Sequence, residues 1–473
     1  MLATLVAKSG SRTIPIVAIP RAAWRRRLAA EPANIRAWAE TTHFTGEPGG
    51  FFLVPGANGG LARVLLVLPE AFDGREGGYG GMPSGGHLWT WAALPARLPV
   101  ATYRIDGELS PEAATEAALG WALGSYGFLR YGVNTPAFAR LAWPKGADRA
   151  EVERTWKATY LVRDLITTPA SDMGPAELAQ AAVDAVAPFD ARVTTIIGDK
   201  LLGKNYPMIH AVGRASARAP RLVDIAWGDR AAPRVTLVGK GVCFDTGGLD
   251  LKPSSGMKLM KKDMAGAAQA LGLGTMIMAA GIDVRLRVLL PLVENSVAGN
   301  AFRPMDVLQT RKGITVEVGN TDAEGRLILA DALTEADRDK PALLCDFSTL
   351  TGAARTALGT ELPALFTNSR ELSSAIRRAG EDACDPVWPL PLWQPYRDKL
   401  SSKVATLNNI SEGPYAGAIT AALFLSEFVS PKTPWAHLDF MGWNDSSRPG
   451  RPEGGEAQGM RGFYRAIVAR FGS

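Results

Sequence analysis

Short apolar runs alternate with stretches of helical periodicity along most of the chain. In the first third, the pattern predicts a helix at 111–126 and strands at 13–19, 51–54 and 62–68. Further on, apolar or β-branched runs predict strands at 193–197, 222–227, 235–238, 284–290, 314–318 and 343–347. Helical stretches separate several of these runs. Such alternation is typical of an α/β protein whose largely parallel sheet is covered by helices.

The length of 473 residues predicts more than one domain, because hydrophobic cores usually divide beyond about 250 to 300 residues. A helix expected at about 148–167 would link a small N-terminal α/β domain (1–147) to a larger C-terminal α/β domain (148–473). Pro169 would end this helix, and a following helix to about residue 186 would have its cap within 172–175.

The composition excludes several classes of protein but does not identify the function. Hydrophobic residues make up 47% and charged residues 21%, an ordinary globular balance that excludes wholesale disorder. A net charge of +5 is too small for this length to indicate nucleic acid or a membrane as a partner, and the basic run Trp24–Arg27 fits a solvated helix face. Three cysteines cannot build a disulfide framework, and the apolar run 2–7 lacks the features of a signal peptide. We therefore expect a cytoplasmic protein.

Two other segments are assigned no chemistry. Residues 264–282 carry no charge and are long enough to suggest a membrane span, but four glycines and Gln269 favour a buried core helix. The glycine-rich stretch 77–86 lacks a flanking phosphate-loop pattern and is expected to be a surface loop. No membrane association is predicted.

Polar residues gather in two places directly after predicted strands, where open α/β sheets bind their ligands. The first runs from Lys240 through Asp245 to Lys252 and Asp263, and the second is the stretch 319–326. Together they hold the carboxylates Asp245, Asp263, Asp322 and Glu324 and the cations Lys240, Lys252 and Arg326. Buried carboxylates would repel one another, and two divalent cations would balance four of them. The alternative, a surface network of salt bridges, fits less well with the many glycines around both clusters.

The second stretch, Asn320–Leu327, resembles the signature octapeptide of the leucyl aminopeptidase (cytosol aminopeptidase) family. Similarity to this family extends from about Arg163 to near the C-terminus and includes 349–354 and 435–439. The resemblance implies a two-metal aminopeptidase, with the catalytic domain in the C-terminal part. The first third shows no motif that matches the family, so a family-like domain there rests on analogy.

Position by position, the resemblance implies roles for these residues. One ion would be held by Lys240, Asp245, Asp263 and Glu324, and a second, more exchangeable ion by Asp245, Asp322 and Glu324. A water between the two ions would be the nucleophile. The resemblance further makes Lys252 a stabiliser of the developing oxyanion and Arg326 the holder of a bicarbonate. The free α-amine of a peptide substrate would bind one metal, which explains cleavage at the N-terminus.

The chemistry of Lys240 limits the choice of metal, since a lysine can bind an ion only as the neutral amine. That amine suits Zn²⁺, while the carboxylate-rich second position also suits Mn²⁺ or Mg²⁺. Without metal, we expect Lys240 to be protonated and to pair with Asp245.

The resemblance also implies a pocket for the first side chain of the substrate, which would favour leucine-like residues. Its walls would be Met260, Thr349, Gly352 and Met460. The alternative interpretation is that each methionine only packs in the core. Thr168 and the segment 406–409 depart from the family pattern, which leaves the substrate range and the subunit contacts open. Family members are usually homohexamers, and we expect the same here.

Rival functions find little support. The stretch 198–205 nearly fits a phosphate-binding loop, but Asn205 stands where Ser or Thr would contact Mg²⁺. Asp245–Gly247 echoes the aspartic protease triplet, which needs two such carboxylates and occurs once. The four histidines are too far apart for a His-Glu-x-x-His helix. A two-metal phosphoesterase, and a metal-free relative that binds DNA or acts as a scaffold, remain the alternatives to test.

Overall fold

The computed structural model describes residues 4–7, 13–69, 87–132 and 137–472. The predicted loop at 77–86 and the first residues of the apolar run 2–7 lie outside this part of the chain. The chain divides into two compact units, one of Met1–Lys157 with Ser446–Pro452 and one of Ala158–Asp445 with Glu453–Ser473. The division falls inside α5 (Arg149–Thr167), after the boundary predicted at residue 147.

The first unit contains a six-stranded sheet with the order β1-β6-β5-β2-β4-β3, in which only β3 and β4 pair in antiparallel fashion. Its strands are β1 (Leu5–Val6), β2 (Ile14–Pro20), β3 (Phe51–Pro55), β4 (Leu61–Leu68), β5 (Thr102–Asp106) and β6 (Arg140–Ala142). Its helices are η1 (Arg21–Ala23), α1 (Trp24–Ala29), α2 (Ala33–Thr41), α3 (Leu88–Ala92) and α4 (Pro111–Gly124). The helix α4 starts where predicted, because Ser110 accepts a hydrogen bond from the backbone of Ala113 and Pro111 takes the first turn.

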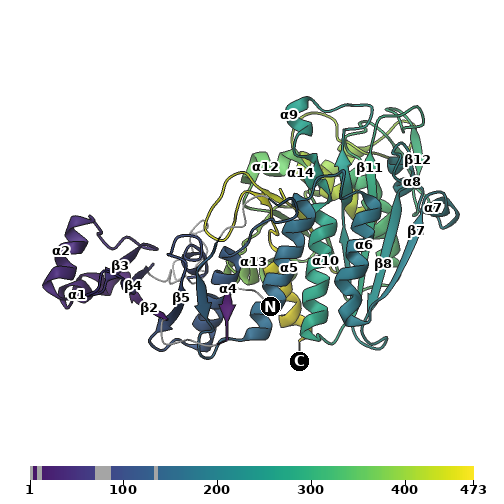
Figure 1. The fold of residues 1–473 in the computed structure, drawn as a ribbon. Coiled ribbons are helices and arrows are strands. Elements are labelled where there is room, and N and C mark those ends of the chain that lie inside the picture. The colour runs from purple at the N-terminus through teal and green to yellow at the C-terminus, as the bar shows by residue number, and fades with distance from the viewer. Residues whose placement is uncertain (1–3, 8–12, 70–86, 133–136, 473) are drawn as a thin grey trace. The chain divides into compact units, whose positions relative to one another are not determined.

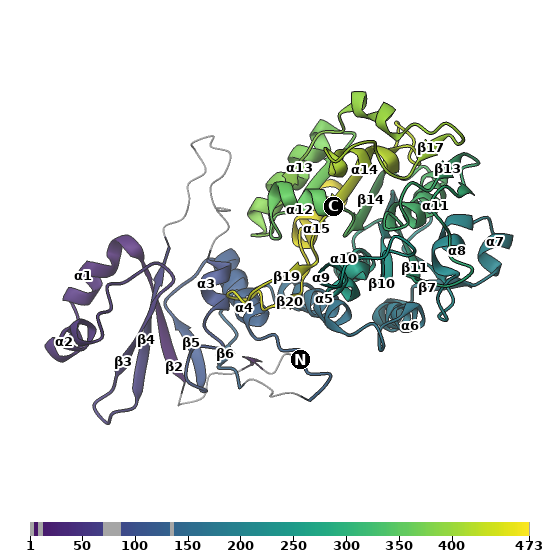
Figure 2. The same ribbon diagram turned by 90° about the horizontal axis from the view of Figure 1, so that it is seen from above.

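The second unit is built on a nine-stranded sheet with the order β16-β15-β18-β14-β9-β11-β8-β7, and β10 also pairs with β11 (Figures 1 and 2). Its strands are β7 (Arg192–Ile197), β8 (Arg221–Trp227), β9 (Arg234–Gly239), β10 (Gly241–Asp245), β11 (Arg285–Asn295), β14 (Leu343–Ser348), β15 (Ala364–Thr367), β16 (Trp388–Pro389) and β18 (Trp435–Asp439). Three pairs are antiparallel, namely β7–β8, β8–β11 and β15–β18, and the others are parallel. The predicted α/β class with a largely parallel sheet is confirmed.

Helices cover both faces of this sheet. On one face, α5, α6 (Pro175–Val186), α10 (Ala265–Ala280), α13 (Arg370–Asp382) and α15 (Met460–Phe471) share a hydrophobic core with the strands (Figure 1). On the other face the core is formed by α8 (Pro207–Gly213), α11 (Gly325–Arg338) and α14 (Gly417–Ser426). The remaining helices of this unit are η2 (Ala187–Phe189), α7 (Lys200–Gly203), α9 (Ser254–Met257), η3 (Met260–Met264), α12 (Gly352–Leu358) and η4 (Gln394–Leu400).

The uncharged segment 264–282 forms the buried helix α10, as predicted. Nearly every residue from Ala265 to Met278 is buried, and Gly281 ends the helix with a left-handed backbone conformation. Among the described residues, no helix has the length and apolar character needed to cross a membrane.

One predicted strand lies outside the large sheet. The run at 314–318 forms β13 (Thr315–Glu317), which pairs with β12 (Val307–Gln309) and β17 (Leu407–Asn408) in a three-stranded sheet of its own. A two-stranded ribbon of β19 (Trp443–Asn444) and β20 (Gly454–Gly455) completes the strands. Within the small sheet, β13 directly precedes the second polar cluster of the sequence, and the pairing of β13 therefore helps to position that cluster.

Candidate metal centre

The first polar cluster lies at the carboxyl ends of neighbouring strands. Lys240 follows β9, and Asp245 is the last residue of β10. Thr349 follows β14, which pairs with β9 in parallel. Because parallel strands end at the same edge of the sheet, three separate segments deliver polar side chains to one place.

The other carboxylates lie directly before helices. Asp263 lies in η3, directly before the buried helix α10. Asp322 and Glu324 precede α11, whose first residue is Gly325. The positive end of a helix favours nearby negative charge, which suits Glu324 at the start of α11.

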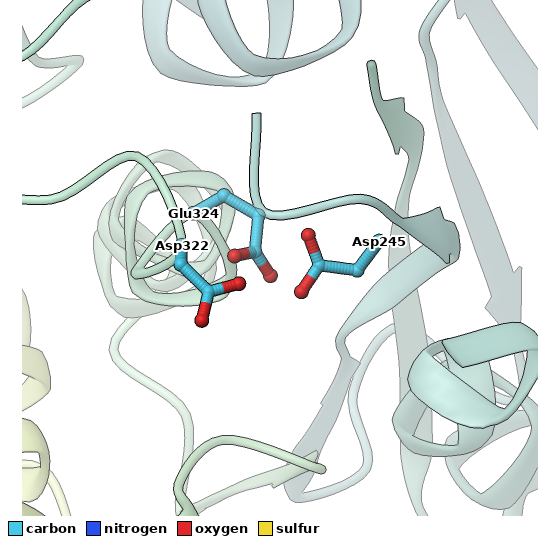
Figure 3. A group of neighbouring side chains, drawn as sticks. All are labelled: Asp245, Asp322 and Glu324. Atoms are coloured by element: carbon cyan, nitrogen blue, oxygen red, sulfur yellow. The ribbon is translucent and has the colours of Figure 1, made fainter. Parts of the chain in front are cut away.

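The structure brings together the six polar residues that the sequence singled out for metal binding and charge stabilisation. Lys240 Nζ lies 2.7 Å from Asp263 Oδ2 and 3.1 Å from Glu324 Oε1. Lys252 Nζ lies 2.9 Å from Asp245 Oδ2 and also forms an ion pair with Asp322. Figure 3 shows carboxylate groups of Asp245, Asp322 and Glu324 turned toward one another, each with an oxygen within 4.8 Å of the others.

The predicted partner of Lys240 was wrong. Lys240 pairs with Asp263 and Glu324, whereas Asp245 pairs with Lys252. The reason is topological: Lys240 lies at the end of β9, where η3 and the start of α11 meet it, while Lys252 enters from the loop after β10.

Burial makes this concentration of charge costly. Asp245 and Glu324 are 2% and 1% exposed. Burial, followed by repulsion from Asp263, raises the pKa of Asp245 to about 6, although Lys252 and Lys240 oppose the rise. Burial and repulsion from Asp245 raise the pKa of Glu324 to about 8. Both carboxylates therefore need more positive charge nearby than the two lysines provide.

Both oxygens of Glu324 are buried without a hydrogen bond, since its contact with Lys240 lacks hydrogen-bond geometry. Buried polar atoms of this kind are rare in proteins, and a bound ion is one standard explanation. Carboxylate oxygens suit divalent cations, and a neutral lysine amine suits zinc. The residues present thus fit a metal site.

Thr349 contacts the acidic cluster directly. Its hydroxyl donates to Asp263 Oδ1 at 2.6 Å, and its carbonyl accepts from Lys240 Nζ at 3.2 Å. Asp439, at the end of β18, holds the next residues by accepting from the backbone of Leu350 at 2.9 Å and from the hydroxyl of Thr351 at 2.6 Å. Thr349, predicted to line the substrate pocket, therefore also orients Asp263.

Two supporting residues were missed at the sequence level. Asn295, the last residue of β11, donates from Nδ2 to Asp245 Oδ1 at 2.9 Å and to the carbonyl of Thr321 at 3.1 Å. Asp439 likewise ends a strand. The rule that led to Lys240 and Asp245, a polar residue at the end of an apolar run, would have found both.

The other predicted residues occupy different surroundings. Met260 is 9% exposed at the start of η3, and Gly352 opens α12. Arg326 is buried, which lowers the pKa of its guanidinium to about 10, and it donates to the carbonyl of Asn409 at 2.6 Å. Met460 is fully buried in the core and packs beside Gly272, farther along α10.

Close backbone contacts fix the frame of the site. A side chain at Gly266, in the first turn of α10, would place its Cβ 2.1 Å from the carbonyl oxygen of Phe347 in β14. At Gly239, the end of β9, a Cβ would lie 2.4 Å from the carbonyl oxygen of Gly266. The backbone of Ala267 also donates to the carbonyl of Lys240 at 2.8 Å. The helix that follows Asp263 is thus held against the strand that precedes Lys240.

We expect Gly266→Ala to destabilise the protein by about 1–3 kcal/mol, because overpacking against backbone atoms cannot be relieved by a change of rotamer. Urea unfolding of the two proteins measures the difference. Gly203→Ala, at a helical position with open space and no left-handed φ, serves as the control for the loss of a helical glycine. A Gly266→Ala protein as stable as the wild type would contradict the close approach.

Comparison with known proteins agrees with this arrangement. The catalytic-domain model of the cytosol aminopeptidase family matches residues 160–467. A model of the M17 aminopeptidase N-terminal domain matches residues 14–144, where the sequence alone showed no family motif.

Individual relatives cover most of the chain. A crystal structure of the cytosol aminopeptidase from Coxiella burnetii is 45% identical, covers 99% of both chains and superimposes with a TM-score of 0.91. The bottromycin maturation enzyme BotP, solved in complex with Mn, is 32% identical, covers 97% of this chain and 100% of its own, and has a TM-score of 0.83. A probable cytosol aminopeptidase from Roseiflexus castenholzii is 38% identical over 77% of this chain and 78% of its own. The chain therefore belongs to the cytosol aminopeptidase family and is a metal-dependent aminopeptidase.

Proposed function

We propose that this enzyme releases N-terminal residues from peptides with a free α-amine and prefers leucine-like first residues. The observation that carries the proposal is the gathering of Asp245, Asp322 and Glu324 within 4.8 Å, next to Lys240, Lys252 and Asp263. An acidic cluster of this kind fits two divalent cations. Zn²⁺ and Mn²⁺ are the ions proposed, with Mg²⁺ as a further candidate at the position richer in carboxylates.

We assign each of these residues a proposed role. Lys240, Asp245, Asp263 and Glu324 would hold one cation, and Asp245, Asp322 and Glu324 the other. When bound, the two cations would polarise the scissile carbonyl and supply an activated water for attack. Thr349 and Asn295 keep Asp263 and Asp245 in their orientations through the hydrogen bonds described above.

Lys252 is suited to stabilise negative charge on the substrate carbonyl oxygen. Burial disfavours its charge, but attraction from Asp245 and Asp322 outweighs burial and raises its pKa above the ordinary value. Its side chain is 14% exposed, so it is less deeply buried than Lys240, whose side chain is 4% exposed. Such a positive charge would attract the substrate carbonyl oxygen more strongly as negative charge develops on that oxygen.

Arg326 is proposed to hold a bicarbonate that relays protons, and Met260, Thr349 and Gly352 to line the pocket for the first side chain. The apolar Met260 favours leucine-like residues there. Met460, proposed as a further wall, would contribute through its packing against α10. A homohexameric assembly and a cytoplasmic location are proposed from the family resemblance and from the names of the relatives.

The proposal is tested by removing metal and restoring it. The purified protein is treated with a chelator and assayed with leucine p-nitroanilide before and after addition of Mn²⁺ or Zn²⁺. We expect the rate to fall by about 1,000-fold or more without metal, because the ions supply several kcal/mol of transition-state stabilisation. Either ion should restore it.

Two further substrates separate the alternatives. N-acetyl-leucine p-nitroanilide lacks the free amine and should not be cleaved, and bis-p-nitrophenyl phosphate tests for a phosphoesterase. Turnover of the phosphate ester alone would favour that class, and no turnover of any substrate would favour a scaffold. A full rate after complete metal removal would refute the mechanism.

A further inference from the structure

Asn409 belongs to the segment 406–409, which departs from the family pattern and carries no predicted ligand. The structure shows where this segment lies. Its strand β17 runs parallel to β13, with Val316 opposite Leu407, and the backbone of Asn409 donates to the carbonyl of Glu317 at 3.0 Å. The pairing places Asn409 beside the loop that leads from β13 to Asp322 and Glu324.

The side chain of Asn409 is fully buried, and its amide is saturated by that loop. Its Oδ1 accepts from the backbone of Gly319 at 2.7 Å and of Asn320 at 3.2 Å. Its Nδ2 donates to the carbonyls of Asn320 at 2.8 Å and Ala323 at 3.3 Å. Two acceptor and two donor contacts are the full capacity of an amide side chain.

The main chain of Asn409 reaches a second part of the site. Its carbonyl accepts the 2.6 Å hydrogen bond from Arg326, in the first turn of α11. The loop that bears Asp322 and Glu324 is therefore held on one side by the amide, and the helix start that follows is held by the carbonyl of the same residue.

The segment 408–410 packs tightly against the loop that leads to Asp322. A Cβ at Gly319 would lie 2.4 Å from Asn408 Oδ1 and 2.6 Å from Ile410 Cγ1. The loop and the segment 408–410 are thus in close contact, and a shift of Asn409 would be passed directly to the loop.

We infer that Asn409 is a positioning residue of the metal centre, which fixes the loop that presents Asp322 and Glu324 and fixes Arg326 beside it. The inference rests on the proposed function, since it assigns Asn409 to residues proposed to bind the cations. An ordinary buried asparagine would stabilise the fold without any effect on metal binding, and this difference can be measured.

The decisive variant is Asn409→Ala, with Asn408→Ala as a matched control. The neighbouring Asn408 amide packs against Gly319 of the loop but accepts from the backbone of Ile410, so the control removes a packing contact with the loop and no hydrogen bond to it. Mn²⁺ affinity is measured by titration calorimetry, and kcat and KM with leucine p-nitroanilide at saturating Mn²⁺. Loss of a group that orients a metal ligand typically costs 10- to 100-fold in affinity or activity. We expect Asn409→Ala to weaken Mn²⁺ binding by about 10- to 100-fold and to lower kcat more than it changes KM, while Asn408→Ala stays close to the wild type.

Three results would overturn the inference. Asn409→Ala could bind Mn²⁺ and turn over substrate as the wild type does. It could lower the melting temperature while affinity and kcat stay unchanged, which marks a residue that serves the fold alone. The control could lose affinity equally, which would point to a general effect of the strand.

If Asn409→Ala does not fold, Asn409→Ser is judged by the same measurements, with a smaller expected loss because the hydroxyl keeps one donor and one acceptor. The proposed function is checked separately in the wild type. A wild-type enzyme that binds Mn²⁺ and depends on it, together with an unaffected Asn409→Ala, refutes this inference alone. A wild-type enzyme that needs no metal refutes both.

Discussion

The Asp263→Ala enzyme is expected to lose bound metal and turnover together. Asp263 is 2% exposed, lies 2.7 Å from Lys240 Nζ and is oriented by the hydroxyl of Thr349. Its removal takes one carboxylate from the first proposed ion, and it leaves Lys240 with Glu324 as its remaining ion-pair partner. We expect at least one equivalent of metal per chain to be lost and kcat/KM to fall by about 1,000-fold or more, since loss of an ion forfeits several kcal/mol.

The measurement combines elemental analysis of the dialysed protein with the leucine p-nitroanilide assay. Asp331→Ala is the matched control, because Asp331 is also a fully buried aspartate but accepts hydrogen bonds from the backbones of Met208 and Arg311. The control should lower stability and keep its metal. An Asp263→Ala enzyme with full metal content would remove Asp263 from the proposed ligands.

Lys252→Met, in contrast, should keep the metal and lose the rate. Lys252 contacts Asp245 and Asp322 and is not among the residues proposed to hold the cations, so we expect it to act as a charge and not as a ligand. Removal of one preorganised charge at a developing oxyanion typically lowers kcat about 100- to 1,000-fold. Because the pKa of Lys252 is raised, its positive charge is present throughout the neutral range, and the loss should not depend on pH there.

Metal content, kcat and KM of Lys252→Met are compared with those of Lys258→Met, since Lys258 is an exposed lysine directly after the short helix α9. Unchanged metal content with a lower kcat supports the assignment. Loss of metal in Lys252→Met would mean that Lys252 supports the ligands structurally, and an unchanged kcat would mean that it does not act in the reaction.

Much of the site could be predicted from the sequence because its signal is local. Lys240 and Asp245 end apolar runs of the large sheet, so their place at one edge of it follows from the topology of parallel sheets. Asp322 and Glu324 could be singled out because they lie between a strand and a helix, although that strand, β13, belongs to the small sheet. Five strands of the large sheet (β7, β8, β9, β11 and β14) and the buried helix α10 were predicted for the same reason, since each is a continuous apolar run, whereas β10, β15, β16 and β18 were not predicted.

The rest depends on contacts between distant segments. Asn409 reaches the loop after β13 because β17 pairs with β13. The sequence of neither strand indicates which other strand it pairs with. The partner of Lys240 was predicted wrongly because the sequence does not show which carboxylate η3 and α11 bring to it. The N-terminal domain carries no short motif, and its family membership was visible only when 14–144 was compared as a whole.

The glycines at the end of β9 and the start of α10 have a consequence for how this enzyme could be redesigned. Where main chain meets main chain, there are no side chains whose repacking could absorb a change, so the geometry between Lys240 and Asp263 has little room to adapt. The proposed wall for the first residue consists of side chains such as Met260, which can be exchanged one at a time. New specificities should therefore be reachable by altering that wall, while the hydrolytic core stays the same from one variant to the next.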